Sequence, residues 1–110
     1  MLPDAGDIVW AELDPLLGSE QAGRRPVLVI SPRSLHEVSR RALVCPITSR
    51  RFAWTTTVAL PEGMRVTGSV LTDQLRSVDR AARMHDFIER APVEVLAEVR
   101  AKLGSILGIL

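Results

Sequence analysis

The sequence has a single cysteine, Cys45, among its 110 residues. One cysteine excludes an intramolecular disulfide and a cysteine metal cluster. Because it lies in the apolar run "ALVCPI", we expect a small buried side chain of the core. Lysine is as scarce, since Lys102 is the only lysine among 14 basic residues. The others are arginines, whose planar guanidinium suits bidentate contacts with phosphate better than an ammonium does.

The sequence also shows no targeting signal and no membrane-spanning run. The first residues, "MLPDAGD", contain neither a basic nor an apolar stretch, so no signal peptide is expected. No window approaches the roughly 18 apolar residues that a membrane span requires. The formal net charge is only +1, which provides no global field to attract nucleic acid. We therefore expect a cytoplasmic chain that makes no membrane contact.

Common catalytic motifs are missing as well. His36 and His85 belong to neither an HxxxH nor an HExxH pattern, and we expect both at the surface or in loops. There is no GxSxG elbow and no GxxxxGK[ST] phosphate loop. These absences argue against the usual hydrolase and nucleotide-binding classes, and we expect neither a metal ion nor a cofactor.

What is present indicates one globular domain over residues 1–110. Hydrophobic residues make up 46% and charged residues 25% of the chain, an ordinary globular composition. Short, evenly spaced apolar segments predict strands and a small curled barrel. The expected strands cover 7–13, 26–30, 42–48, 55–60, 66–72 and 74–80, with Trp10 in the core. Helical spacing from Pro92 to Leu110 predicts a terminal helix.

Polar side chains gather at the ends of these strands. Those before the second strand are Ser19, Glu20, Gln21, Arg24 and Arg25. Thr48 follows the third strand, and Asp73, Gln74 and Arg76 lie between the last two. If the strands are neighbours, their ends form one surface that can hold a phosphate without a metal. The alternative is that these are ordinary solvated loops.

Three ordered motifs carry a family resemblance. They are "GDIVWAELDPLLGSEQAGRRPVLVISP" (6–32), "VCPITSR" (44–50) and "TGSVLTDQLRSVDRAAR" (67–83). Together they resemble the MazF/PemK/Kid family of toxin endoribonucleases over nearly the whole chain. The resemblance implies an α+β, mainly β fold, an SH3-like small β-barrel with short helices and a C-terminal helix. It also implies a homodimer.

The activity implied by the resemblance is sequence-specific cleavage of single-stranded RNA without a metal. The ribose 2′-OH attacks the adjacent phosphorus, leaving a 2′,3′-cyclic phosphate and a 5′-OH end. Such cleavage of messenger RNA, or of ribosomal or transfer RNA, inhibits translation and growth. Arg25 and Thr48 match the family's catalytic pair. Ser19, Glu20, Gln21 and Gln74 match its substrate-contacting positions, whereas no role transfers to Arg24.

The chemistry of these side chains agrees with that assignment. Arg25 supplies a permanent charge and two parallel donors, and Thr48 supplies a hydroxyl. Arginine is a poor base because its pKa exceeds about 12. Two roles in proton transfer stay open: Glu20 as the base that takes the 2′-OH proton, and Arg25 as the acid that gives a proton to the leaving oxygen. The segment "RRFAW" (50–54) can follow RNA, with Arg50 on phosphate and Trp54 stacked on a base. Alternatively, an aromatic side chain of this segment plugs the barrel end.

The resemblance also implies partners. The natural inhibitor would be an antitoxin with an acidic, partly disordered tail, and DNA would be bound only indirectly, through that antitoxin. Two other functions remain open. One is a gyrase poison like the CcdB toxins, which share the barrel but end in Trp-Gly-Ile, unlike the "GSILGIL" ending here. The other is a catalytically silent member that only binds RNA or antitoxin.

Overall fold

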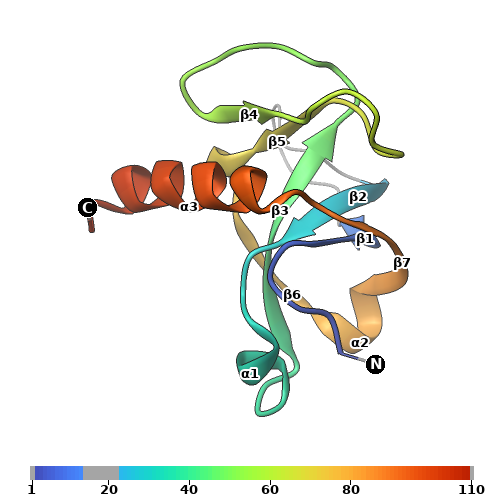
Figure 1. Ribbon diagram of the computed structural model, residues 1–110. Helices are drawn as coiled ribbons and strands as arrows, with labels where there is room; N and C mark the ends of the chain where they lie inside the picture. Colours follow the sequence, from blue (N-terminus) through green and yellow to red (C-terminus); the bar gives the residue numbers. More distant parts are fainter. Residues whose placement is uncertain (1, 14–22, 110) are drawn as a thin grey trace.

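A computed structural model of the chain describes residues 2–13 and 23–109. A curled antiparallel sheet dominates it, and one long helix lies alongside (Figure 1). The strands are β1 (Asp7–Leu13), β2 (Gly23–Val29), β3 (Arg41–Thr48), β4 (Thr57–Ala59), β5 (Ser69–Leu71), β6 (Arg76–Asp79) and β7 (Met84–Arg90). The helices are α1 (Arg33–His36), the 3-10 turn η1 (Thr72–Gln74), α2 (Arg80–Arg83) and α3 (Val93–Leu107). The expected mainly β class with a terminal helix is confirmed.

Strand β3 organises the sheet because it changes partner along its length. The strand order is β4-β5-β3-β2-β1-β7, and β6 pairs with the other part of β3. Residues 41–44 of β3 pair with β6, whereas Ile47 and Thr48 pair with β5. Pro46 lies between these two ladders, where a residue without an N–H costs the sheet little.

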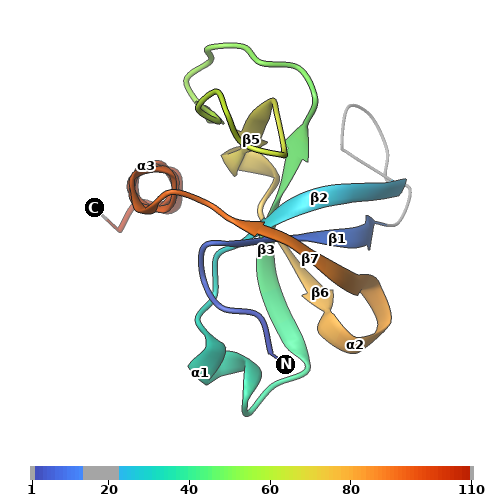
Figure 2. The same ribbon diagram turned by 45° about the vertical axis from the view of Figure 1, so that its right-hand side comes forward.

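The sheet curls but does not close. Among the described residues, no ladder joins β6 to β7. Instead, the short helix α2 connects the end of β6 to β7, which pairs with β1 (Figure 2). Asp79 begins α2 by accepting a hydrogen bond from the backbone N–H of Ala82 at 3.1 Å. The expected SH3-like barrel is therefore an open one.

Two apolar clusters lie on opposite faces of the sheet, because side chains alternate along each strand. One packs under α3 and includes Ile8, Leu28, Cys45, Ile47 and Val99. The other includes Val9, Ala11, Val27, Val29 and Val44. Cys45 is fully buried, as expected, and burial raises the pKa of its thiol to about 12.

The Trp10 side chain does not lie where the sequence predicts it. Trp10 is 36% exposed rather than in the core: it shares a row of β1 with the buried Ile8, but the core cluster ends at Ile8 on that row. The Arg24 guanidinium lies 5.7 Å from the centroid of its ring.

His36 also differs from the prediction, since it is buried rather than at the surface. Its ring lies within hydrogen-bonding distance of the Ser31 hydroxyl, at 2.7 Å, and of the Pro3 carbonyl oxygen, at 2.8 Å.

The last third of the chain also differs in part. The expected strands 66–72 and 74–80 shorten to β5 and β6, and β7 is not predicted from the sequence. Strand β7 is polar because it is an edge strand on which only Ile88 is buried. Helix α3 is confirmed and ends at Gly108, whose φ of 72° is left-handed. In the described ranges, no helix is long and apolar enough to span a membrane.

Candidate functional site

Arg25 and Thr48 occupy aligned positions on neighbouring strands. The β2–β3 ladder pairs Val27 with Pro46, and continuing that antiparallel register by two residues sets Arg25 opposite Thr48. Arg25 is half-buried, and Thr48 is 8% exposed. The extended register thus places the two predicted catalytic residues across from each other, two residues beyond the last pair of the ladder.

The two side chains also share a face. On β2, Arg25 alternates with Val27 and Val29, and both valines belong to the second apolar cluster. On β3, Thr48 follows Ile47, whose side chain belongs to the opposite cluster. Since alternate residues face opposite sides of a strand, Arg25 and Thr48 lie on the side of the second cluster. Arg24 lies on the other side, beside Trp10.

The backbone of Thr48 is held from β5. Thr48 pairs with Ser69 in the β3–β5 ladder, and Gly68 precedes this pair with a φ of 122°. A Cβ atom on Gly68 would collide with the Thr48 carbonyl oxygen and lie 2.8 Å from its carbon. The Arg50 N–H donates a long hydrogen bond of 3.4 Å to the Thr48 hydroxyl. The hydroxyl is thereby placed at the start of the following loop.

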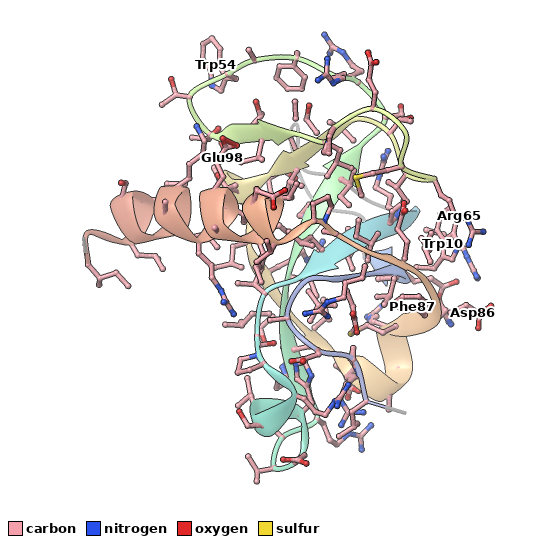
Figure 3. The ribbon with its side chains drawn as sticks, viewed as in Figure 1. Trp10, Trp54, Arg65, Asp86, Phe87 and Glu98 are labelled. Carbon is pink, nitrogen blue, oxygen red and sulfur yellow. The ribbon has the colours of Figure 1, made fainter. Side chains whose placement is uncertain are left out.

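The loop at residues 49–56 carries the predicted Arg50 and Trp54. The Phe52 N–H donates to the Ser69 hydroxyl at 3.2 Å, and the Trp54 N–H donates to the Thr57 hydroxyl at 3.0 Å. These bonds fix the loop backbone while the Trp54 side chain remains 67% exposed above β4 (Figure 3). The Arg50 guanidinium lies 5.4 Å from the Phe52 ring centroid. The alternative in which an aromatic side chain of this segment plugs the barrel end therefore does not apply to Trp54.

Gln74 ends the η1 turn, which packs against both β3 and α3. Its side chain is half-buried. Asp73 beside it accepts a hydrogen bond from the Thr56 hydroxyl at 3.1 Å, which ties this turn to the 49–56 loop. Ser19, Glu20 and Gln21 lie outside the described residues, so their predicted role stays a prediction.

The sequence pointed to Arg76 but not to Arg41 or Arg83. Arg41, Arg76 and Arg83 line a cavity of about 280 Å³ between β6, α2 and Glu12. The Nη1 atom of Arg76 is buried and has no hydrogen-bond partner within the described part of the chain. Arg76 precedes Ser77 in a stretch that reads as an ordinary strand, so only the tertiary structure brings these guanidinium groups together.

Residues 2–13 and 23–109 contain no group of three or more histidine, cysteine, aspartate or glutamate side chains placed to hold a metal ion. What the site does hold is a guanidinium, a hydroxyl and further cations around one strand end. Such donors suit a phosphate. The fold and the candidate site define a small, mainly β protein with donors of the kind that suit a phosphodiester.

Comparison with known proteins makes this class specific. The profile of the PemK-like, MazF-like toxins of type II toxin-antitoxin systems matches residues 4–107. The chain belongs to this family. Endoribonuclease PemK of Escherichia coli is 40% identical over 108 residues, covering 94% of this chain and 81% of the relative. Endoribonuclease toxin MazF of Escherichia coli (strain K12) is 34% identical over 107 residues, covering 97% and 96%.

Solved structures agree. The crystal structure of MazF from Deinococcus radiodurans has a TM-score of 0.91 and 46% identity, covering 98% of both chains. A MazE-MazF structure from the same organism has a TM-score of 0.85 and 44% identity, covering 100% of this chain and 99% of that one.

Proposed function

We propose that this chain is the toxin of a type II toxin–antitoxin system and an endoribonuclease that cleaves single-stranded RNA at the Arg25–Thr48 site. Family membership and the relatives named endoribonucleases support the activity. The observation that carries the site is the alignment of Arg25 with Thr48 on one face at the end of the sheet.

The proposed reaction is a transesterification within the RNA. The 2′-oxygen forms a bond to phosphorus as the bond from phosphorus to the 5′-oxygen breaks. The 2′-OH gives up its proton, and the departing 5′-oxygen gains one, leaving a 2′,3′-cyclic phosphate and a 5′-OH end. Negative charge gathers on the non-bridging oxygens in the transition state. A preorganised donor at such a position is worth about 2.7–4 kcal/mol.

Arg25 and Thr48 are the proposed donors. Arg25 stabilises the charge with two parallel N–H groups. Thr48 adds a hydroxyl from a buried position that pairs with Ser69 of β5. A nearly rigid site is what this form of catalysis requires, since donors that need not reorganise act most strongly.

Substrate binding is assigned to the loops around this pair. Trp54, exposed on a fixed loop, stacks on a base, and Arg50 contacts phosphate. Gln74 contacts the RNA from the η1 turn. Arg76 and Arg83, which line the cavity beside β6 and α2, are assigned to backbone phosphates. Ser19, Glu20 and Gln21 complete the proposed substrate-binding set.

The proposed partners are an antitoxin and a second copy of the chain. Relatives from Deinococcus radiodurans were solved as MazE-MazF, which supports an antitoxin partner here, with an acidic tail. Ile106, Leu107 and Ile109 expose apolar surface at the end of α3, which suits packing against a second copy. DNA is reached only through the antitoxin, and the proposed place of action is the bacterial cytoplasm.

The test is incubation of the purified protein with a long single-stranded RNA in excess EDTA, followed by analysis of the new ends. We expect fragments with 5′-OH ends, and no cleavage of an all-deoxy strand of the same sequence. Intact RNA, together with inhibition of gyrase, would assign the chain to the topoisomerase poisons instead. Intact RNA without gyrase inhibition would indicate a silent member of the family.

A further inference from the structure

A groove of about 340 Å³ lies between helix α3 and the loop at residues 49–56. Thr55 and Thr56 line it from the loop, and Glu98 and Lys102 line it from the helix. The groove therefore joins the terminal helix, which takes no part in the cleavage proposed above, to the loop to which RNA binding is assigned.

Hydrogen bonds from two other elements hold parts of this loop. The Ser69 hydroxyl of β5 accepts from the Phe52 N–H at 3.2 Å. The Asp73 carboxylate of η1 accepts from the Thr56 hydroxyl at 3.1 Å. Neither of these bonds holds Thr55, which is an exposed residue.

Lys102 supplies a contact at Thr55. Its Nζ atom donates to the Thr55 carbonyl oxygen at 2.8 Å, across 47 positions of sequence. Lys102 is the only lysine of the chain, and it is half-buried on α3. A hydrogen bond to a charged group contributes more than one between neutral groups. Helix α3 thus holds the loop at the residue that directly follows Trp54.

The surroundings of this ammonium favour a positioning role over a direct contact with phosphate. Glu98 lies one turn earlier than Lys102 on the same face of α3, lines the same groove, and stands on the side of the helix toward the loop (Figure 3). A carboxylate at this place offsets the charge of the lysine and repels a phosphate that approaches the groove.

The loop needs such a fixed point because packing does not hold the side chain that it presents. The Trp54 ring is 67% exposed, so its place depends on the backbone beneath it. A side chain that must be ordered during binding lowers the affinity, and one that is ordered beforehand avoids this cost. A loop fixed by α3 therefore binds RNA more tightly without any added contact.

We propose that Lys102 is a positioning residue for RNA binding. Its ammonium holds the Thr55 carbonyl and thereby fixes the loop that presents Arg50 and Trp54. The inference rests on the proposed function, in which this loop contacts the substrate. The chemical step does not depend on Lys102, because Thr48 is held separately by its pairing with Ser69.

The test compares Lys102→Met with Lys102→Arg in the full-length protein. Methionine keeps an unbranched stem but cannot donate, whereas arginine keeps donors at its end. Binding of an all-deoxy strand is measured by fluorescence anisotropy, and the single-turnover cleavage rate at saturating protein measures the chemical step. We expect Lys102→Met to bind about threefold to tenfold more weakly with an unchanged saturating rate. Lys102→Arg should restore most of the affinity.

Arg100→Met is the matched control. Arg100 also lies on α3, and its Nη2 atom donates to the Ile30 carbonyl oxygen at 3.3 Å. This variant loses one cation and one bond to a carbonyl oxygen away from the loop, so it should bind as the native protein does. Thermal unfolding of Lys102→Met should match that of the native protein, because the lost bond is exposed to solvent.

Two further measurements distinguish positioning from contact with RNA. Hydrogen exchange of the Phe52 and Trp54 amides, measured without nucleic acid, should be faster in Lys102→Met than in Arg100→Met. The salt dependence of binding should keep its slope, since positioning neutralises no phosphate. A direct contact would instead lower the slope of log K against log salt by about 0.7.

Several outcomes overturn the inference. Native exchange and native affinity in Lys102→Met would remove Lys102 from the support of the loop. A lowered salt slope would make it a phosphate contact, and a lowered saturating rate would place it in the chemical step. A native protein that binds the all-deoxy strand but leaves RNA intact rejects the proposed cleavage alone, and the comparison of variants still decides the role of Lys102. A native protein that binds neither strand rejects both.

Discussion

Gly68 and Thr48 are in backbone contact across the β3–β5 ladder, so close that residue 68 has no room for a side chain. A Cβ atom there would meet the Thr48 carbonyl group and lie 3.0 Å from the carbonyl carbon of Ser49. The φ of Gly68 is 122°, a conformation that favours glycine. The position of a proposed catalytic hydroxyl thus depends on a glycine on another strand.

Gly68→Ala is expected to lower both stability and RNA cleavage. Backbone strain alone costs about 1–3 kcal/mol, and the collision displaces Thr48. Gly63→Ala is the matched control, since Gly63 has a φ of 92° but nothing within 4 Å of the added Cβ. Thermal unfolding and initial cleavage rates are the measurements. Loss of activity in Gly63→Ala equal to that in Gly68→Ala would contradict the role of the contact.

Arg25→Lys is expected to lower cleavage by about a hundredfold to a thousandfold. Lysine keeps the charge but cannot present two parallel donors to a phosphate. Arg24→Lys is the control, because Arg24 faces Trp10 on the other side of the sheet, and it should cleave as the native protein does. Single-turnover rates with saturating protein separate the chemical step from binding. A lysine variant with native rates would remove Arg25 from the reaction.

Trp54→Ala is expected to weaken RNA binding without destabilising the fold. Stacking of a base on an aromatic side chain is worth about 1–3 kcal/mol, which corresponds to roughly fivefold to 150-fold in affinity. Stability should persist because the ring is 67% exposed and its backbone N–H remains bonded to Thr57. Trp54→Phe should restore most of the affinity. Binding of an all-deoxy strand, measured by fluorescence anisotropy, decides between stacking and a role in packing.

Asp79 is expected to make the fold sensitive to acid. The hydrogen bond from the Ala82 N–H, followed by the charge of Arg40, holds the pKa of this carboxyl below its ordinary value of 3.8. A lowered pKa in the folded state gives stability that is complete above the ordinary value and is lost as the pH falls through the folded one. Asp79→Asn should therefore show a shallower loss of thermal stability over about pH 5 to pH 2.

The exposed carboxyl of Asp86 on β7 provides the control for that experiment. Asp86→Asn should follow the pH profile of the native protein. If both variants change the profile equally, the acid sensitivity belongs to the overall charge and not to the start of α2.

The sequence predicted the parts of the fold that local patterns encode. Alternation located β1, short apolar runs located β2 and β3 to within a few residues, and helical spacing located α3. The burial of Cys45 follows from its apolar surroundings. The family resemblance, through its Arg-Pro pair and strand-ending threonine, pointed to Arg25 and Thr48 before any register was known. The assignment of Ser19, Glu20 and Gln21 to the substrate remains a prediction.

Local sequence patterns did not predict the features that depend on contacts between distant segments of the chain. Strand β7 is polar, so nothing in its own residues distinguishes it from a loop until β1 pairs with it. Trp10 reads as a core residue, yet the packing that buries Ile8 on the same row of β1 does not extend to it. His36 reads as a surface residue, yet the Ser31 hydroxyl and the Pro3 carbonyl satisfy its ring in the interior.

By itself, the sequence determined which residue types stand at the strand ends, and therefore the phosphate chemistry available to this protein. Only the tertiary structure decided how they are used. Alternation sends the adjacent side chains of Arg24 and Arg25 to opposite faces, but which face meets Thr48 depends on the β2–β3 register. A cavity of about 620 Å³ between Phe87, Arg33 and Arg80 likewise combines residues far apart in sequence. Register and long-range contact arise from packing between segments, which no local pattern contains.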